Sequence, residues 1–127
     1  MSRILVIEED EAVRTIAARI LRDARHDVAS EPSFLAATVN HSGTAFDLVL
    51  INGGGVAWRQ QLLIAGQVKA IWDAVVVLVS GAVESGIPLT QHSHFSLLRK
   101  PFTPAELLEA VSLATARAHV RHGQDAR

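Results

Sequence analysis

Apolar residues along the chain gather in short runs that polar and glycine-containing segments separate. Four runs stand out, at residues 4–7, 48–51, 74–79 and 95–98. The first three are nearly continuous and rich in Val and Ile, which is typical of strands buried on both faces of a parallel sheet. A weaker strand candidate at residues 27–30 comes second in chain order, so the pattern predicts five strands.

Between these runs, apolar residues recur at the three- and four-residue spacing of an amphipathic helix. The spacing predicts helices over residues 11–24, 33–39, 58–71 and 104–120. The segment 82–94 is the poorest helix candidate, because Gly86 and Pro88 disfavour the interior of a helix.

Capping residues predict where two of these helices begin. Asp10 precedes the first helix and is placed to accept a hydrogen bond from its first turn. Thr103 and Glu106 form a capping box, with a proline between them at the first helical position. The apolar positions at helical spacing include several large side chains, among them Ile16, Leu63, Ile71 and Leu113.

The order of the elements predicts the fold class. Strands that alternate with helices are joined by right-handed crossovers into a parallel sheet covered on both faces. We therefore expect a doubly wound α/β fold in one domain over residues 1–121, followed by a polar tail at 122–127. A chain of 127 residues can form one core of ordinary size and leaves little for a second.

Composition excludes several classes of protein. The chain has no cysteine, which excludes disulfides, thiolate metal sites and cysteine nucleophiles. The formal net charge is −1, from 12 basic and 13 acidic side chains, so no basic excess indicates a nucleic-acid partner. A helix that spans a membrane needs about 20 consecutive apolar residues, and every apolar run of this chain is much shorter. We therefore expect a soluble cytoplasmic protein.

Polar side chains follow the predicted strands, where ligands bind in an open parallel sheet. Glu8 and Glu9 follow the first strand, Asn52 the third, Ser80 the fourth and Lys100 the fifth. Carboxylates hold divalent cations through oxygen, whereas a lysine or a hydroxyl contacts phosphoryl oxygens. The sequence therefore predicts a small anion or metal–phosphate site at the carboxyl edge of the sheet.

Four sequence segments carry a resemblance to a known family. They are RILVIEEDEAVR, FDLVLIN, VVVLVSG and LLRKPFTPAELLEAV, in this order along the chain. From about Arg3 to Val120, the chain resembles the receiver domain of bacterial response regulators, the phosphoacceptor module of two-component signalling. The resemblance implies a stand-alone receiver with a flavodoxin-like three-layer sandwich and the strand order 2-1-3-4-5. It also implies partners from such a pathway: a histidine kinase, a phosphotransferase or a downstream regulator.

The resemblance implies a role for each polar strand end. In the family, an acidic pair helps to bind Mg²⁺, an aspartate accepts the phosphoryl group, a hydroxyl and an aromatic residue act as switches, and a lysine completes the pocket. The matching positions here are Glu8 and Glu9 for the acidic pair, Asn52 for the phosphoacceptor, Ser80 and Leu97 for the switch residues, and Lys100 for the lysine.

Three of these positions depart from the family's pattern. Asn52 ends in a carboxamide, which is not the nucleophile that an aspartyl phosphate requires. Glu9 is one methylene longer than the usual aspartate, and Mg²⁺ requires near-ideal geometry. This weakens the case for Mg²⁺ as a cofactor and for Glu9 as its ligand. Leu97 stands in the place of the aromatic switch residue. We therefore hypothesise a pseudo-receiver, not an enzyme, in which Lys100 pairs with Glu8 or Glu9 and hydrogen-bonds Asn52.

Two alternatives remain. In the first, the chain is a conventionally phosphorylated or Mg²⁺-dependent receiver that uses a neighbouring acid, or an aspartate formed by deamidation of Asn52. In the second, a small α/β enzyme uses four residues as its acid–base groups: Glu8, Glu9, Ser80 and Lys100. Carboxylates beside a lysine favour its ammonium form, which disfavours the lysine as a base. The sequence leaves the oligomeric state open, with a dimer among the alternatives.

Overall fold

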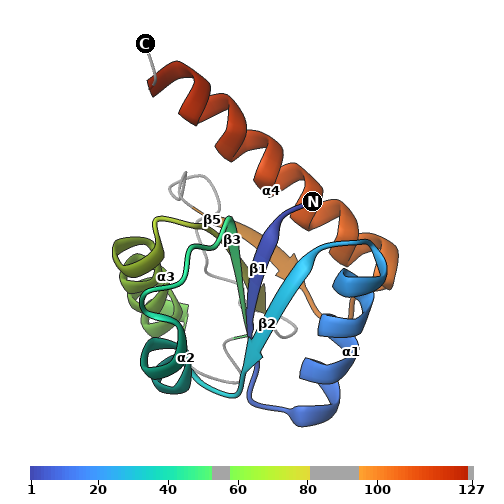
Figure 1. The fold of residues 1–127 in the computed structure, drawn as a ribbon. Helices are drawn as coiled ribbons and strands as arrows, with labels where there is room; N and C mark the ends of the chain where they lie inside the picture. The colour runs from blue at the N-terminus through green and yellow to red at the C-terminus, as the bar shows by residue number, and fades with distance from the viewer. Residues whose placement is uncertain (53–57, 81–94, 126–127) are drawn as a thin grey trace.

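The computed structural model of the protein describes residues 1–52, 58–80 and 95–125 (Figure 1). Strands and helices alternate along most of this part of the chain. The elements are β1 (Arg3–Ile7), α1 (Glu11–Asp23), β2 (Asp27–Glu31), α2 (Phe34–His41), β3 (Leu48–Asn52), α3 (Trp58–Trp72), β4 (Val75–Ser80), β5 (Phe95–Arg99) and α4 (Pro104–Asp125). The weak helix candidate at 82–94 lies outside the described residues.

The five strands form one parallel sheet in the order β2-β1-β3-β4-β5. This order confirms the predicted doubly wound, flavodoxin-like α/β fold. It also confirms the weak strand candidate at 27–30, which becomes the edge strand β2. In a sheet with this order, the direction of winding changes between β1 and β3, and ligands bind beyond the carboxyl ends of these strands.

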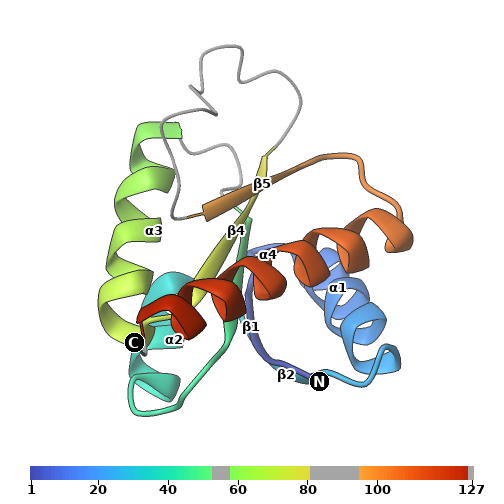
Figure 2. The ribbon, with the colours of Figure 1, turned by 90° about the horizontal axis from the view of Figure 1, so that it is seen from above.

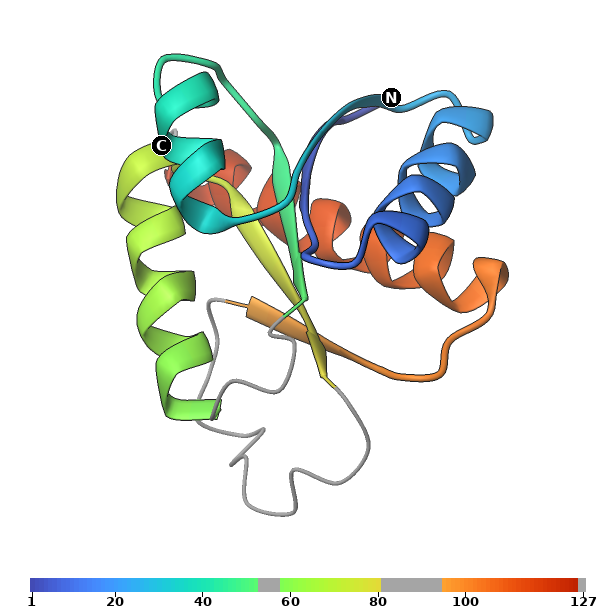
Figure 3. The ribbon, with the colours of Figure 1, turned by 90° about the horizontal axis from the view of Figure 1, so that it is seen from below.

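Helices cover both faces of the sheet and give the molecule three layers (Figure 3). Helices α1 and α4 lie side by side on one face, and α2 and α3 lie on the other (Figures 2 and 3). Alternate strand residues point to opposite faces. Val6 and Leu50 belong to the apolar cluster on the α1–α4 face, whereas Ile7 and Ile51 belong to the cluster on the α2–α3 face. Burial on both faces explains why the strands read as continuous apolar runs.

Polar caps begin three of the helices. The Asp10 carboxylate accepts a hydrogen bond from the amide of Val13 at 3.0 Å, and Ser33 caps α2 in the same way. At the start of α4, the Thr103 hydroxyl accepts from the Glu106 amide at 3.1 Å. The Thr103 amide in turn donates to the Glu106 carboxylate at 3.0 Å. The predicted Asp10 cap and the predicted capping box are both confirmed.

The helices do not bury every large side chain of their apolar stripes. Four of these residues are exposed: Ile16 by 59%, Leu63 by 69%, Ile71 by 39% and Leu113 by 52%. An apolar stripe is wider than the line along which a helix contacts a sheet, so residues at its edge stay in solvent. Small residues such as Ala17 occupy the line of contact.

Helix α4 runs to Asp125, so the predicted helix end at 120 is too early. Leu107, Val111 and Ala114 bury its first half against the sheet. Figure 1 shows its later turns continuing past the sheet. A helix that has formed gains a hydrogen bond with each added residue, and no proline interrupts this one. Among the helices of the described ranges, none combines the length and the apolarity that a membrane crossing requires.

Candidate functional site

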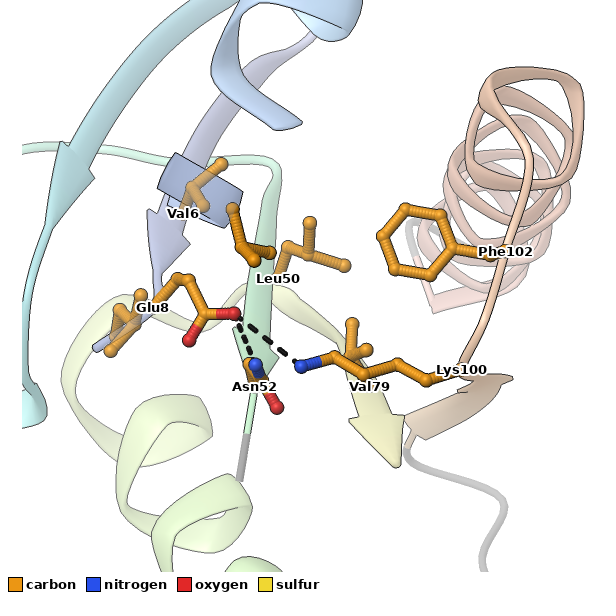
Figure 4. Close-up of a pocket in the computed structure, with 9 residues that line it drawn as sticks. Val6, Glu8, Leu50, Asn52, Val79, Lys100 and Phe102 are labelled. Atoms are coloured by element: carbon orange, nitrogen blue, oxygen red, sulfur yellow. Dashed lines mark hydrogen bonds and ion pairs between the residues drawn. The ribbon is translucent and has the colours of Figure 1, made fainter. Parts of the chain in front are cut away.

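A pocket lies at the carboxyl edge of the sheet, beyond the ends of β1, β3 and β5 (Figure 4). The pocket is partly open to solvent. Apolar side chains from Val6, Leu50, Val79 and Phe102 line it together with three polar residues, Glu8, Asn52 and Lys100.

The two-residue repeat of the strands brings these three polar residues to one face. Each stands two positions after an apolar residue of the α1–α4 cluster: Glu8 after Val6, Asn52 after Leu50, and Lys100 after Leu98. Because alternate positions of a strand share a face, each polar residue extends a buried apolar row by one step. The polar cluster is therefore the outer end of the core on this face.

Glu8 is the buried carboxylate of the pocket, with 4% of its surface exposed. Its backbone amide donates to the carbonyl of Glu31 at 3.0 Å, which extends the pairing of β1 with β2. Arg14 on α1 donates to the Glu8 carbonyl at 2.8 Å and to the Glu9 carbonyl at 3.4 Å. These bonds hold the backbone of the turn between β1 and α1, from which the Glu8 side chain enters the pocket.

Among the described residues, three donors surround the Glu8 carboxylate. Nδ2 of Asn52 donates to Oε1, and Nζ of Lys100 lies 3.6 Å from the same oxygen. The backbone amide of Asp10 donates to Oε2 at 3.3 Å. Because an ionised carboxylate only accepts hydrogen bonds, the nitrogen of the Asn52 carboxamide, and not its oxygen, faces Glu8.

Lys100 reaches this carboxylate from the end of β5. Its side chain is 32% exposed and that of Glu8 only 4%, so the ammonium approaches the buried group from the solvent side. Figure 4 shows the Lys100 and Asn52 side chains converging on the same Glu8 oxygen. Of the two partners that the sequence allowed for Lys100, the structure pairs it with Glu8.

The other candidate residues lie apart from this cluster or are placed by their backbone alone. Glu9 is exposed and does not line the pocket, so the predicted acidic pair is divided. Ser80 ends β4 opposite Arg99, and Leu97 on β5 lies opposite Leu78. The glycine-rich loop after β3 lies outside the described residues.

Two residues that contribute to the site, Phe102 and Arg14, were not predicted from the sequence. Phe102 lines the pocket two residues after Lys100, and the two-residue repeat is the signal that could have found it. Arg14 holds the turn between β1 and α1, but nothing in its helical spacing marks that contact.

Comparison with known proteins identifies the fold. No family model matches the sequence, and no curated protein matches it. The structure is similar to NtrX from Brucella abortus in complex with ADP, with a TM-score of 0.82 and 20% identity over 98% of this chain and 28% of that chain. It is also similar to a response regulator receiver domain protein from Clostridium thermocellum, with a TM-score of 0.75 and 21% identity over 94% and 98% of the two chains. The chain has the receiver-domain fold.

The same receiver fold relates the chain to the chemotaxis response regulator CheY4 of Vibrio cholerae. That comparison gives a TM-score of 0.74 and 16% identity over 90% of this chain and 98% of the other. The chain matches nearly the whole of the small regulators but spans only 28% of the NtrX chain.

A receiver fold implies Mg²⁺ near this edge of the sheet, but the residues of this pocket do not fit the ion. Mg²⁺ requires oxygen ligands in near-octahedral geometry. Here only Glu8 of the acidic pair enters the pocket, and its Oε1 faces an ammonium and an amide nitrogen. Within the described residues, no three His, Cys, Asp or Glu side chains gather closely enough to hold a metal ion.

Proposed function

We propose that the chain is a pseudo-receiver, a signalling module that acts through protein–protein contacts in a two-component pathway. It transfers no phosphoryl group through residue 52 and catalyses no reaction. The observation that carries the proposal is Asn52 at the carboxyl end of β3, with its amide nitrogen turned onto the buried carboxylate of Glu8. A carboxamide cannot act as the nucleophile of an aspartyl phosphate.

The charges of the pocket support a state that needs no phosphate. Glu8 is negative, Lys100 is positive and Asn52 is neutral, so the formal charges of the cluster cancel. The ion pair keeps the Lys100 ammonium at the carboxyl edge without a phosphoryl group to attract it. The proposed module therefore presents this edge in one arrangement, whatever the phosphorylation state of its pathway.

The proposed partners are the proteins of such a pathway in the cytoplasm: a histidine kinase, a phosphotransferase or a downstream regulator. The support for this class of partner is the receiver fold, which the chain has in common with solved response regulators. A partner of this kind would recognise the surface of the folded module and not a phosphorylated side chain.

Geometry weighs against both alternatives. Phosphorylation of a neighbouring acid requires an available carboxylate, but both oxygens of Glu8 accept hydrogen bonds, and Glu9 lies outside the pocket. A small α/β enzyme would use Glu8 and Lys100 as free acid–base groups, whereas here these two groups are paired with each other.

The proposal is tested by treating the protein with a small-molecule phosphodonor and Mg²⁺ and then measuring its intact mass. We expect no adduct on the wild type. Asn52→Asp restores a carboxylate at the end of β3, and we expect a gain of about 80 Da, one phosphoryl group, on that variant. Peptide mapping then assigns the adduct to a residue.

A matched control is Asn40→Asp, which makes the same substitution at an exposed position on α2, outside the pocket. It should behave as the wild type does. A stable adduct on a pocket residue of the wild type would contradict the proposal. If an adduct forms on residue 52 of the wild type, peptide mapping of aged protein shows whether deamidation has converted Asn52 to an aspartate.

A further inference from the structure

The pocket holds a complete pair of opposite charges. Of the described residues that line it, only Glu8 and Lys100 are ionisable, and the buried one is the carboxylate. An ionised carboxylate with 4% of its surface exposed requires a counter-charge, because burial removes most of its hydration. The Lys100 ammonium at 3.6 Å supplies that charge.

Both oxygens of the carboxylate also have donors beside them. Its Oε1 receives the Asn52 amide nitrogen and faces the Lys100 ammonium, while its Oε2 receives the Asp10 amide. All three groups present positive hydrogens to Glu8. A metal ion that approached Oε1 would meet the hydrogens of two of them, and coordination would require both to move away.

We propose that the Lys100 ammonium is the resident cation of this pocket, in the place that a divalent ion takes beside a buried carboxylate. The lysine is part of the chain, so it does not lose the translational freedom that a free ion loses on binding. Because Asn52 here replaces an acidic oxygen donor with an amide nitrogen on the same Oε1, the ammonium has no competing ligand set for a divalent cation beside it, and the pocket stays closed to such ions while Lys100 holds this place. This inference extends the proposed pseudo-receiver function to the regulation of the same site.

The test removes the ammonium and keeps the rest of the side chain. Lys100→Met retains an unbranched stem of similar length and leaves the position of Nζ empty beside Glu8. We expect this variant to bind Mn²⁺, a spectroscopic substitute for Mg²⁺, about tenfold or more tightly than the wild type, because the repelling charge beside the carboxylate is gone. Electron paramagnetic resonance of free Mn²⁺ measures the binding.

Three variants control the experiment. Glu8→Gln combined with Lys100→Met should lose the gained affinity, which assigns the ion to the pocket and not to exposed acids such as Glu9. Lys69→Met removes the only other lysine of the chain, which lies on α3 with its Nζ 3.5 Å from Asp73, and should leave Mn²⁺ binding unchanged. Lys100→Arg keeps a positive charge and should bind no better than the wild type.

The outcomes separate the inference from the proposed function. Glu8-dependent Mn²⁺ binding by the wild type, or no gain in folded Lys100→Met, overturns the inference and leaves the absence of phosphorylation untouched. If circular dichroism finds Lys100→Met unfolded, nuclear magnetic resonance of the wild type decides. The Asn52 side-chain amide signals should keep their intensity when Mn²⁺ is added, and their selective broadening would overturn the inference.

Discussion

Glu8 and Lys100 differ in exposure, and this difference decides what each contributes to stability. Removing the charge of Glu8 leaves an ammonium that is 32% exposed and can regain water. Removing the charge of Lys100 leaves a carboxylate that is 4% exposed and cannot. Breaking a buried pair is costly mainly because one charge stays behind without a partner. The two single substitutions should therefore have unequal effects.

We expect Lys100→Met to lower the free energy of unfolding by about 2 kcal/mol and Glu8→Gln by about 1 kcal/mol. Urea denaturation in a chelating buffer measures both values, and the chelator keeps divalent ions from stabilising the lysine variant. The double variant should cost less than the sum of the two, since each partner is removed together with the charge that opposed it. A larger loss for Glu8→Gln than for Lys100→Met would contradict this account.

At the scale of elements, the sequence predicts best where burial or capping leaves little choice. The strands are buried on both faces, so their apolar runs are easily recognised in the sequence. Asp10 and Thr103 carry side-chain oxygens that accept hydrogen bonds from the first turn of a helix, and both cap the helices at the predicted positions. The helix faces are predicted less well, because spacing alone does not say how wide the contact with the sheet is. Ile16 and Leu113 follow the stripe and are nevertheless exposed.

The same distinction applies to the site. The sequence brings Glu8, Asn52 and Lys100 to one edge, because parallel strands end together. It leaves open whether Lys100 pairs with Glu8 or with Glu9. The alternation of side chains along β1 decides this, since Glu8 lies on the same face of the sheet as Val6 and Glu9 does not. The alternation continues for one residue past the end of β1 at Ile7. The contact of Arg14 with the turn depends on three-dimensional packing that no sequence pattern contains.

The capping box of α4 makes a prediction for this helix. Thr103→Ala removes the hydroxyl that accepts from the Glu106 amide and leaves that amide without its capping acceptor. We expect the free energy of unfolding to fall by about 1 kcal/mol, as is usual for the loss of a helix cap. Urea denaturation followed by circular dichroism measures the change. Ser112→Ala, at an exposed position within α4, should change stability by less than about 0.5 kcal/mol, and an equal loss there would refute the capping argument.

At the scale of the whole molecule, the sheet joins the two cores into one structural unit. Neighbouring residues of one strand belong to different clusters, as Leu5 and Val6 do on β1. A cavity on one face therefore removes support from strands that the other face also needs. The polar cluster of the pocket lies at the end of this shared sheet, so its geometry depends on both cores.

Loss of packing on the α1–α4 face should consequently be detected on the α2–α3 face. Leu107→Ala removes a fully buried side chain of α4, and we expect a loss of about 2–5 kcal/mol. Trp72 reports from the opposite face, where it is buried with its ring centroid 6.4 Å from that of Phe46. In a two-state transition, Trp72 fluorescence and circular dichroism should give the same lowered midpoint.

This measurement uses a Trp58→Phe background, because the chain has two tryptophans and only Trp72 should report. Leu113→Ala is the matched control, since it makes the same substitution on α4 at a side chain that is 52% exposed. It should lower the midpoint much less, because little apolar surface leaves the core. If Leu107→Ala shifts the circular dichroism transition but leaves the Trp72 transition in place, the two faces unfold separately. The pocket would then depend on the α1–α4 core alone, to which Val6, Leu50 and Leu98 belong.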